Sequence, residues 1–257
     1  MSRKPNVIYI LADDMGYGDV SALNERAAFR TPNFDRMAAE GLAFTDAHAS
    51  SAVCTPSRYS ILTGRYNWRS RLKCGVMSGY SSPLIEDGRM TVADLFRQNG
   101  YRTAAIGKWH LGMEFKKDES FRMLPDYETC PGVDYAGAIK KSPVAYGFDY
   151  YYGISASLDM APYIYIENDR FTRLPDHETE DTGKRFYRRG PTAPDFVHEE
   201  VLPRLTDKAL ETIERFRNDP FFLYFPMPAP HTPILPSAEF LGKSGTNEYG
   251  DFVLMVD

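Results

Sequence analysis

The sequence predicts an α/β fold with a largely parallel central sheet. Residues 6–11 and 221–225 are apolar runs, the pattern of parallel strands that are covered on both faces, and residues 101–106 are expected to form a strand between them. Helical segments separate the three strands, and polar residues follow each of them. In open α/β sheets, ligands bind beyond the carboxyl ends of the strands. We therefore expect the polar residues after the three strands to converge in one crevice.

Composition and charge limit the classes of function. With 257 residues, 43% of them hydrophobic and 14% aromatic, the chain can bury one sizeable core without a metal or disulfide staple. One large domain, or most of one, is the expectation. The net charge of -5 argues against a general affinity for nucleic acid or an anionic membrane. Any anion site must therefore be local.

The compartment stays open at this level. The sequence has no apolar run long enough to span a bilayer, and residues 7–12 are too short for a signal-peptide core. As written, the chain is expected to be soluble and cytoplasmic, but a periplasmic or secreted protein whose leader had been removed would look the same. Three cysteines do not settle the question, since Cys74 and Cys130 could form a disulfide or remain two thiols.

Three helices can be placed from their capping residues. Residues 31–33, Thr-Pro-Asn, are expected to open a helix that Gly41 stops, with Phe34 and Met37 on its apolar face. Thr91 is expected to cap a helix over residues 92–98. A third helix is expected to run from a cap at Thr206 to about residue 217.

Two polar segments interrupt this pattern. Residues 116–142 and 168–194 have little periodicity and are expected to be excursions from the core. The second includes a basic run, which either forms a solvated loop or lines a rim that attracts polyanions: Lys184, Arg185, Arg188 and Arg189.

The most informative stretch is residues 54–64. Pro56 suits the first turn of a helix and Thr55 is a good N-cap, so a short helix over residues 57–62 is expected, with Gly64 ending it. Cys54 would then sit just ahead of a helix N-terminus, where backbone N–H groups and Arg58 stabilise an anion. The alternative is a small buried cysteine at a helix start.

Polar residues after the three strands are the other candidates for a site. Asp13 and Asp14 are adjacent carboxylates that could bind a hard cation, although polar residues here could equally form a turn. Lys108 and His110, two residues apart in an extended segment, point the same way. His231 stands between prolines, which hold it rigidly.

These residues resemble the motifs of a known family. Cys54-x-Pro56-Ser57-Arg58, followed by x4-Thr63-Gly64, resembles the signature of the formylglycine-dependent (type I) sulfatases. The Gly-Lys-Trp-His-Leu-Gly hexamer around Lys108 and the Pro-His-x-Pro around His231 are similar to further motifs of that family. The resemblance implies an alkaline-phosphatase-like α/β/α sandwich. It also implies that residues 1–257 are an N-terminal catalytic domain, truncated before its C-terminal part.

The resemblance also implies a set of roles. A formylglycine-generating maturation enzyme would oxidise Cys54 to formylglycine, whose hydrated aldehyde is the nucleophile. Ca²⁺, or another divalent metal, would be bound by Asp13, Asp14 and residue 54. Arg58 and Lys108 would hold the nucleophile and the sulfate. His110 would contact the second hydroxyl of the hydrated aldehyde, and His231 would protonate the departing alcohol.

The sequence thus predicts a sulfatase, a sulfuric ester hydrolase. A tyrosine-rich segment, residues 146–165, contains Asp159 and suggests a sulfated carbohydrate, because aromatic faces pack on sugar rings and carboxylates bind hydroxyls. The same tyrosines could instead fill the edge of a core. Two other functions remain open: a phosphonate monoester or phosphodiester hydrolase that uses the same nucleophile, and a non-catalytic binding protein with an unmodified Cys54.

Overall fold

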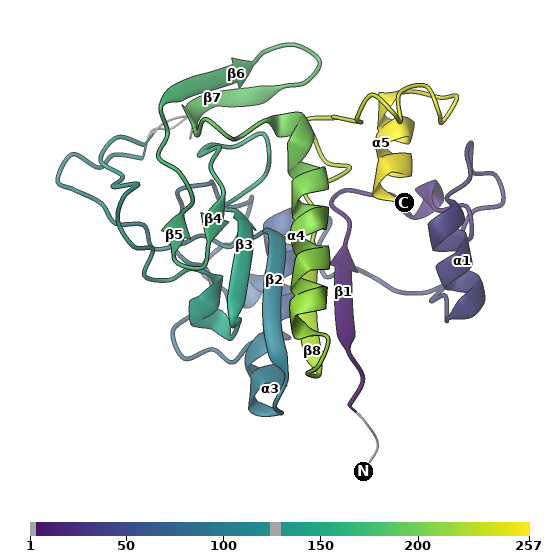
Figure 1. Cartoon of the computed structure of the whole chain (residues 1–257), viewed down its shortest axis with the longest axis horizontal. Helices are drawn as coiled ribbons and strands as arrows, with labels where there is room; N and C mark the ends of the chain where they lie inside the picture. The colour runs from purple at the N-terminus through teal and green to yellow at the C-terminus, as the bar shows by residue number, and fades with distance from the viewer. Residues whose placement is uncertain (1–3, 124–129) are drawn as a thin grey trace.

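The fold is built on a six-stranded sheet with the order β1-β8-β2-β3-β4-β5 (Figure 1). The computed structural model describes residues 4–123 and 130–257. The first four strands in this order are parallel, and the last two are short and antiparallel. Their bounds are β1 Val7–Leu11, β8 Phe221–Pro226, β2 Arg102–Lys108, β3 Tyr150–Ile154, β4 Ile166–Glu167 and β5 Arg170–Phe171. The largely parallel α/β sheet is confirmed.

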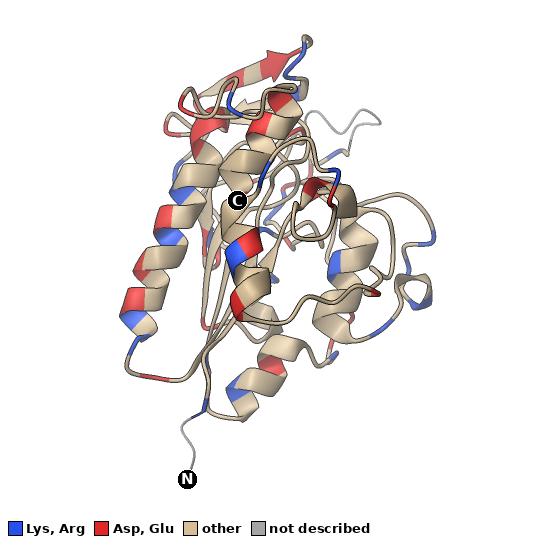
Figure 2. Cartoon of the chain, turned by 90° about the vertical axis from the view of Figure 1, so that its right-hand side faces the viewer, with Lys and Arg blue, Asp and Glu red and all other residues tan. Residues whose placement is uncertain are grey.

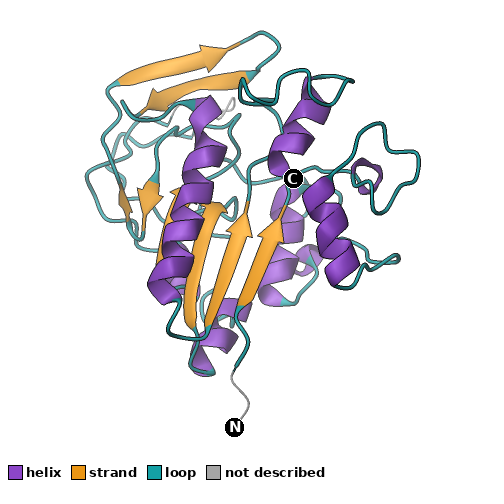
Figure 3. Cartoon of the chain, turned by 45° about the vertical axis from the view of Figure 1, so that its right-hand side comes forward, coloured by secondary structure: helices purple, strands orange, loops and turns teal. Residues whose placement is uncertain are grey.

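Helices cover both faces of the sheet, giving three layers (Figure 3). The long helix α4 (Val201–Phe216) packs on one face, and α2 (Cys54–Thr63) and α3 (Val92–Gln98) pack on the other. Two further helices, α1 (Pro32–Glu40) and α5 (Glu248–Val256), lie beyond β1 at the other side of the molecule (Figure 1). The carboxylate of Asp257 accepts backbone N–H groups at the start of α1 and so joins these two helices.

Alternation along β8 explains the two cores. Its side chains point in turn to opposite faces because a strand has a period of two. Leu223 packs with α4 in one cluster, whereas Tyr224 packs in the other with Tyr59 of α2 and Ala93 of α3. Both faces of the strand are therefore buried, as its continuous apolar sequence predicts.

The strand β1 differs from its expected burial. Among the described residues it pairs only with β8, and its central residues Ile8, Tyr9 and Ile10 are between 42% and 50% exposed. The prediction of a strand covered on both faces is therefore wrong for β1, because it lies at the edge of the described sheet. The apolar face expected for α1 is also open, since Met37 is 60% exposed.

The starts of α2 and α4 differ from those predicted by local sequence patterns, whereas the start of α3 agrees. The α3 cap is confirmed, because the Thr91 hydroxyl accepts the Asp94 N–H in a capping box. In contrast, α2 begins at Cys54 after Val53, and α4 begins at Val201, which places Thr206 inside that helix. Thr206 donates its hydroxyl to the Leu202 carbonyl instead of capping.

The second polar excursion contains regular structure that the sequence did not predict. An antiparallel hairpin is formed by β6 (His177–Asp181) and β7 (Tyr187–Thr192), at the end of the molecule to which the parallel strands point (Figure 1). Charged residues are distributed over this hairpin and over the outward side of α4 (Figure 2). The expectation for residues 116–142 falls partly on residues 124–129, which lie outside the described chain.

Two simpler findings complete the fold. In the described ranges, no helix combines the length and the apolar character that crossing a bilayer requires. Cys74 is exposed and Cys130 is buried, and the two are not joined in a disulfide.

Candidate active site

Cys54 is the first residue of α2, so its side chain lies in the helix's first turn. The N-cap Val53 has extended backbone, and Gly64 ends the helix in the left-handed region at φ 65°. Thr55 does not cap this helix, because its hydroxyl donates to the His110 carbonyl and accepts the Met77 N–H. The first bond ties the start of α2 to the segment that follows β2, and the second ties it to the segment between α2 and α3. Positive charge from the helix dipole is thus centred beside Cys54.

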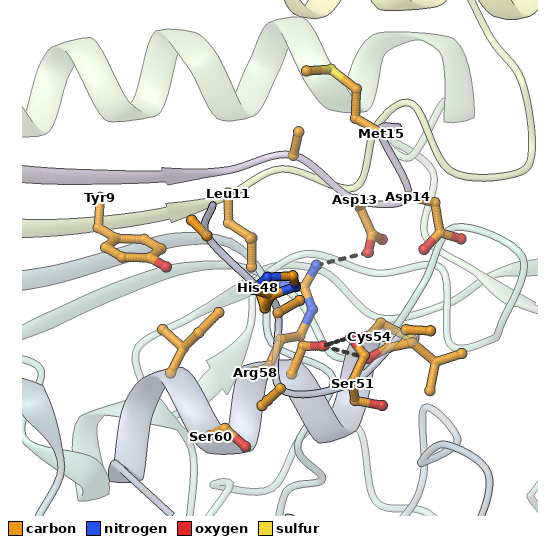
Figure 4. Close-up of a pocket in the computed structure, with 18 residues that line it drawn as sticks. Tyr9, Leu11, Asp13, Asp14, Met15, His48, Ser51, Cys54, Arg58 and Ser60 are labelled. Carbon is orange, nitrogen blue, oxygen red and sulfur yellow. Dashed lines mark hydrogen bonds and ion pairs between the residues drawn. The ribbon is translucent and has the colours of Figure 1, made fainter. Parts of the chain in front are cut away.

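A pocket of about 640 Å³ opens in front of Cys54. Its walls are the end of β1, the segment over residues 47–53, and one side of α2. Figure 4 shows Asp13 and Asp14 pointing from the end of β1 towards Arg58 and Cys54. The structure therefore brings together the two carboxylates, the cysteine and the arginine that the sequence singled out.

Asp13 is held between two buried cations. Its Oδ2 lies 2.5 Å from Lys108 Nζ, and its Oδ1 lies 3.2 Å from Arg58 Nη2. The exposed fractions of these side chains are 4% for Asp13, 0% for Lys108 and 1% for Arg58. Burial alone would raise the pKa of the Asp13 carboxyl, but the two cations lower it below its usual range. Asp13 is therefore ionised at neutral pH.

His110 is a buried, neutral imidazole. Its Nε2 lies 2.6 Å from the Met77 carbonyl, and because a carbonyl only accepts, Nε2 carries the proton. Burial, reinforced by Lys108 and Arg58, lowers the pKa of His110 well below its usual value. The other ring atom, Nδ1, is a buried acceptor without a hydrogen-bond partner among the described residues. An acceptor of this kind suits a hydroxyl donor.

His231 lies at the same end of the sheet, beyond β8. Its Nδ1 is 2.5 Å from the Thr232 carbonyl and so carries the proton, which leaves Nε2 unprotonated in the neutral ring. This Nε2 is 3.5 Å from Asp14 Oδ2. The Ser157 hydroxyl connects His231 to the buried Lys108–Asp13 ion pair, since it lies 3.1 Å from His231 Nδ1 and 2.9 Å from Lys108 Nζ.

The unmodified Cys54 is a poor nucleophile in this setting. Burial raises the pKa of its thiol, and Asp13 acts in the same direction, outweighing the nearby cations. At neutral pH the side chain is therefore mostly thiol. An unaided thiolate attack is not what this environment favours.

The carboxylates provide part of a site for a hard cation. Asp14 sits at φ 63°, a left-handed backbone conformation, and its side chain is 52% exposed at the pocket. In residues 4–123 and 130–257, no group of three or more His, Cys, Asp or Glu side chains is arranged to hold a metal. Asp13 and Asp14 offer the oxygen donors that Ca²⁺ prefers, but fewer than the six to eight that it usually takes.

Asp159 stands apart from this cluster. It is in the loop after β3, two residues beyond Ser157, and its Oδ2 lies 2.5 Å from Arg188 Nη1 on β7. It is not among the residues that line the pocket at Cys54. Its Oδ1 is buried and lacks a hydrogen-bond partner in the described chain.

Sequence reasoning missed Ser157 and the role of Thr55. Ser157 lies in a Ser-Ala-Ser run that follows β3. This strand was not predicted, because it lies inside the tyrosine-rich segment. A small polar residue directly after a parallel strand is the available signal, since this position faces the ligand end of the sheet.

Comparison with known families identifies the family of this chain. A family model described as Sulfatase matches residues 5–257, nearly the whole chain. The chain belongs to the sulfatase family. The resemblance read from the motifs around Cys54, Lys108 and His231 is thereby confirmed.

Individual sulfatases resemble the chain over its full length. It is 33% identical to an N-acetylgalactosamine-6-O-sulfatase of Bacteroides thetaiotaomicron, covering 100% of this chain and 54% of that protein. It is 31% identical to the human N-acetylgalactosamine-6-sulfatase, covering 99% of this chain and 45% of the relative. The chain thus spans about half the length of these curated relatives.

A solved sulfatase structure has the same fold. It comes from work on the metabolism of multiple glycosaminoglycans by Bacteroides thetaiotaomicron, and it superposes with a TM-score of 0.82 at 32% identity. The match covers 99% of this chain and 57% of that one. This chain therefore shares its fold with a solved sulfatase structure.

Proposed function

We propose that this protein is a sulfatase that hydrolyses a sulfate ester on a saccharide, with residue 54 as the nucleophile. One observation carries the proposal: Cys54 opens α2 within a pocket that also holds Asp13, Asp14 and the Arg58 side chain. A helix N-terminus backed by a buried guanidinium stabilises an anion such as sulfate. Membership of the sulfatase family makes sulfate the favoured anion over phosphonate or phosphodiester.

The nucleophile is proposed to be formylglycine made from Cys54 by a maturation enzyme. The raised pKa of the Cys54 thiol supports this, since the unmodified residue would be mostly uncharged. In its hydrated form, formylglycine supplies one hydroxyl to attack sulfur and a second whose deprotonation expels sulfate and restores the aldehyde. The orphaned Nδ1 of His110 is suited to accept a proton or hydrogen bond from that second hydroxyl.

His231 is proposed to assist the departing alcohol. The ring is fixed through Nδ1, and the Asp14 carboxylate lies 3.5 Å from Nε2. A protonated Nε2 can give its proton to the alkoxide oxygen as the S–O bond breaks. Ser157 would keep the ring in place while also binding Lys108.

Asp13, Asp14 and residue 54 are proposed to bind Ca²⁺ or another divalent cation. Bound there, the ion would supply positive charge beside the nucleophile and the sulfate. Lys108 and Arg58 keep Asp13 ionised and aimed at this position, although Lys108 itself is completely buried. We assign Lys108 the task of positioning Asp13 and Ser157.

The proposed substrate class is a sulfated saccharide, of which N-acetylgalactosamine 6-sulfate is the first to test because two relatives carry that specificity in their names. Asp159 is proposed to contribute to sugar binding, with Arg188 fixing the carboxylate. Its carboxylate would accept a hydrogen bond from a sugar hydroxyl.

The deciding experiment combines mass spectrometry with turnover. The protein is produced together with a formylglycine-generating enzyme, and the peptide containing Cys54 is weighed. We expect the aldehyde mass, and hydrolysis of N-acetylgalactosamine 6-sulfate that is abolished in Cys54→Ala. Cys74→Ala, which changes an exposed cysteine, is the matched control and should stay active.

Other outcomes identify the alternatives. An active preparation whose peptide is entirely thiol would contradict the proposed nucleophile. Faster turnover of a diaryl phosphate than of any sulfate ester would instead indicate a phosphodiester or phosphonate hydrolase. Binding of a saccharide without any hydrolytic activity would indicate a non-catalytic binding protein.

A further inference from the structure

An exposed aromatic pair lies on the segment that follows α2. The rings of Tyr66 and Trp68 stack with their centroids 4.0 Å apart and their planes 11° apart. Tyr66 is 54% exposed and Trp68 is 56% exposed, although each could bury a large apolar area. A stacked pair of this size on the surface is a candidate for contact with a ligand.

Hydrogen bonds order the backbone that carries the pair. Residues Asn67–Arg69 form a turn of 3-10 helix, in which Arg69 N–H donates to the Tyr66 carbonyl and Ser70 N–H donates to the Asn67 carbonyl. Lys73 Nζ donates to the Trp68 carbonyl and closes the segment. Because this backbone is already ordered, binding of a ligand to the rings costs little backbone conformational entropy.

Three basic residues lie on the same segment as the aromatic pair or directly after it. Arg69, Arg71 and Lys73 are all exposed. Arg71 and Lys73 bind neutral backbone carbonyls, and these contacts leave their charges uncompensated. This basic segment belongs to a protein whose net charge is -5. The local field therefore favours an anionic ligand.

Neighbouring carboxylates do not cancel this charge. Arg71 borders a groove that also contains Glu86, Asp87 and Glu114. Glu86 contacts Arg65 and Arg89, and Lys141 reaches both Asp87 and Glu114. These acidic groups are thus already paired.

The aromatic pair is separate from the proposed cleavage pocket. Cys54 begins α2 and the pair follows the end of this helix, whose 10 residues span roughly 15 Å at about 1.5 Å per residue. Neither Tyr66 nor Trp68 lines the pocket at Cys54. A ligand that reaches both places must be a chain.

We propose that Tyr66, Trp68, Arg69 and Lys73 form a surface that binds an anionic, sulfated saccharide chain at a distance from the scissile ester. The proposal rests on the proposed function, because a saccharide sulfatase would meet such chains as substrates. Sugar rings stack on the aromatic faces, while sulfate and carboxylate groups pair with the two cations. Contact here raises the local concentration of the chain at the pocket.

The test measures binding and turnover separately. Binding of chondroitin 6-sulfate chains is measured by calorimetry in a Cys54→Ala background, which cannot cleave them. Trp68→Ala, and separately Arg69→Gln with Lys73→Gln, should each weaken binding by about tenfold. Phe44→Ala and Arg36→Gln, which change an exposed aromatic and an exposed arginine elsewhere, should leave it unchanged. With Cys54 intact, Trp68→Ala should leave turnover of N-acetylgalactosamine 6-sulfate unchanged.

Three results would overturn the proposal. The first is unchanged chain binding in Trp68→Ala and in the charge variant. The second is equal binding of unsulfated chondroitin, which would remove the role of the cations. The third is equally tight, Trp68-dependent binding of oligothymidylate, which would assign the surface to single-stranded nucleic acid. If the chain binds through Trp68 but no sulfate ester is hydrolysed, the proposed function fails and this surface stands.

Discussion

Lys108 and Asp13, 95 positions apart in the sequence, form a buried ion pair where β2 and the segment after β1 meet. The second cation at Asp13 is Arg58, from α2. One carboxylate therefore joins three elements that carry separate motifs. This contact explains how the motifs form a single site, and it makes each partner sensitive to loss of the others.

Replacing Lys108 with Met should destabilise the protein by about 3 kcal/mol, because the buried Asp13 keeps only Arg58 as a partner. Urea unfolding measures the loss. Lys140→Met is the control: its ammonium is exposed and 3.9 Å from Glu114, so the change should stay within about 0.5 kcal/mol. Equal stability of Lys108→Met and the parent would show that the ion pair contributes nothing.

His198 should make the fold sensitive to acid. It is buried against the Tyr187 ring, with centroids 3.8 Å apart, and burial lowers the pKa of His198 from 6.5 to about 4. The folded state resists protonation, so the stabilising effect is complete above pH 6.5 and is lost as the pH falls towards 4. Between pH 7 and pH 5 the loss should be about 2 kcal/mol.

The variant His198→Phe tests this prediction, since it keeps an aromatic ring on Tyr187 and removes the titrating group. Thermal unfolding at pH 7 and at pH 5 should show a smaller decrease for the variant than for the parent. His177→Phe, at an exposed histidine, is the matched control. The same acid loss in both variants would assign the pH dependence to other groups.

Asp159→Ala should weaken hydrolysis of a saccharide sulfate much more than hydrolysis of an aryl sulfate, because only the sugar has hydroxyls to donate to the carboxylate. The comparison is kcat/KM for the two substrates. Glu178→Ala, which removes the exposed ion-pair partner of Arg189, should affect neither. Equal losses on both substrates in Asp159→Ala would leave Asp159 a structural partner of Arg188.

Calcium should bind these 257 residues weakly, with a dissociation constant of about 10⁻⁴ M or above, because Asp13 is already paired and few oxygen ligands are assembled. Calorimetric titration measures the affinity. Asp14→Asn should weaken it further, whereas Asp46→Asn, at an exposed aspartate, should not. Tight, stoichiometric binding would mean that ligands beyond Asp13, Asp14 and residue 54 take part.

The relation between local pattern and structure differs from element to element. The role of Thr91 as a helix cap could be predicted from the sequence because its capping partner, Asp94, is three residues away. The role of Thr55 could not be predicted, since its hydroxyl forms hydrogen bonds with His110 and Met77, which are 55 and 22 positions away. Similarly, the basic run at residues 184–189 gains its ion-pair partners only through the fold, where Arg185 meets Glu199 and Arg188 meets Asp159.

The sequence by itself determined the strands β1, β2 and β8, the stop of α2 at Gly64 and the identity of the site's principal residues, because apolar runs, glycine turns and motif spacing act over a few positions. Only the tertiary structure decided which partners these residues have: Asp13 between Lys108 and Arg58, Ser157 between Lys108 and His231, and an orphaned Nδ1 on His110. Burial, protonation and hydrogen-bond partners depend on the chain segments that packing brings together, and no local pattern encodes them.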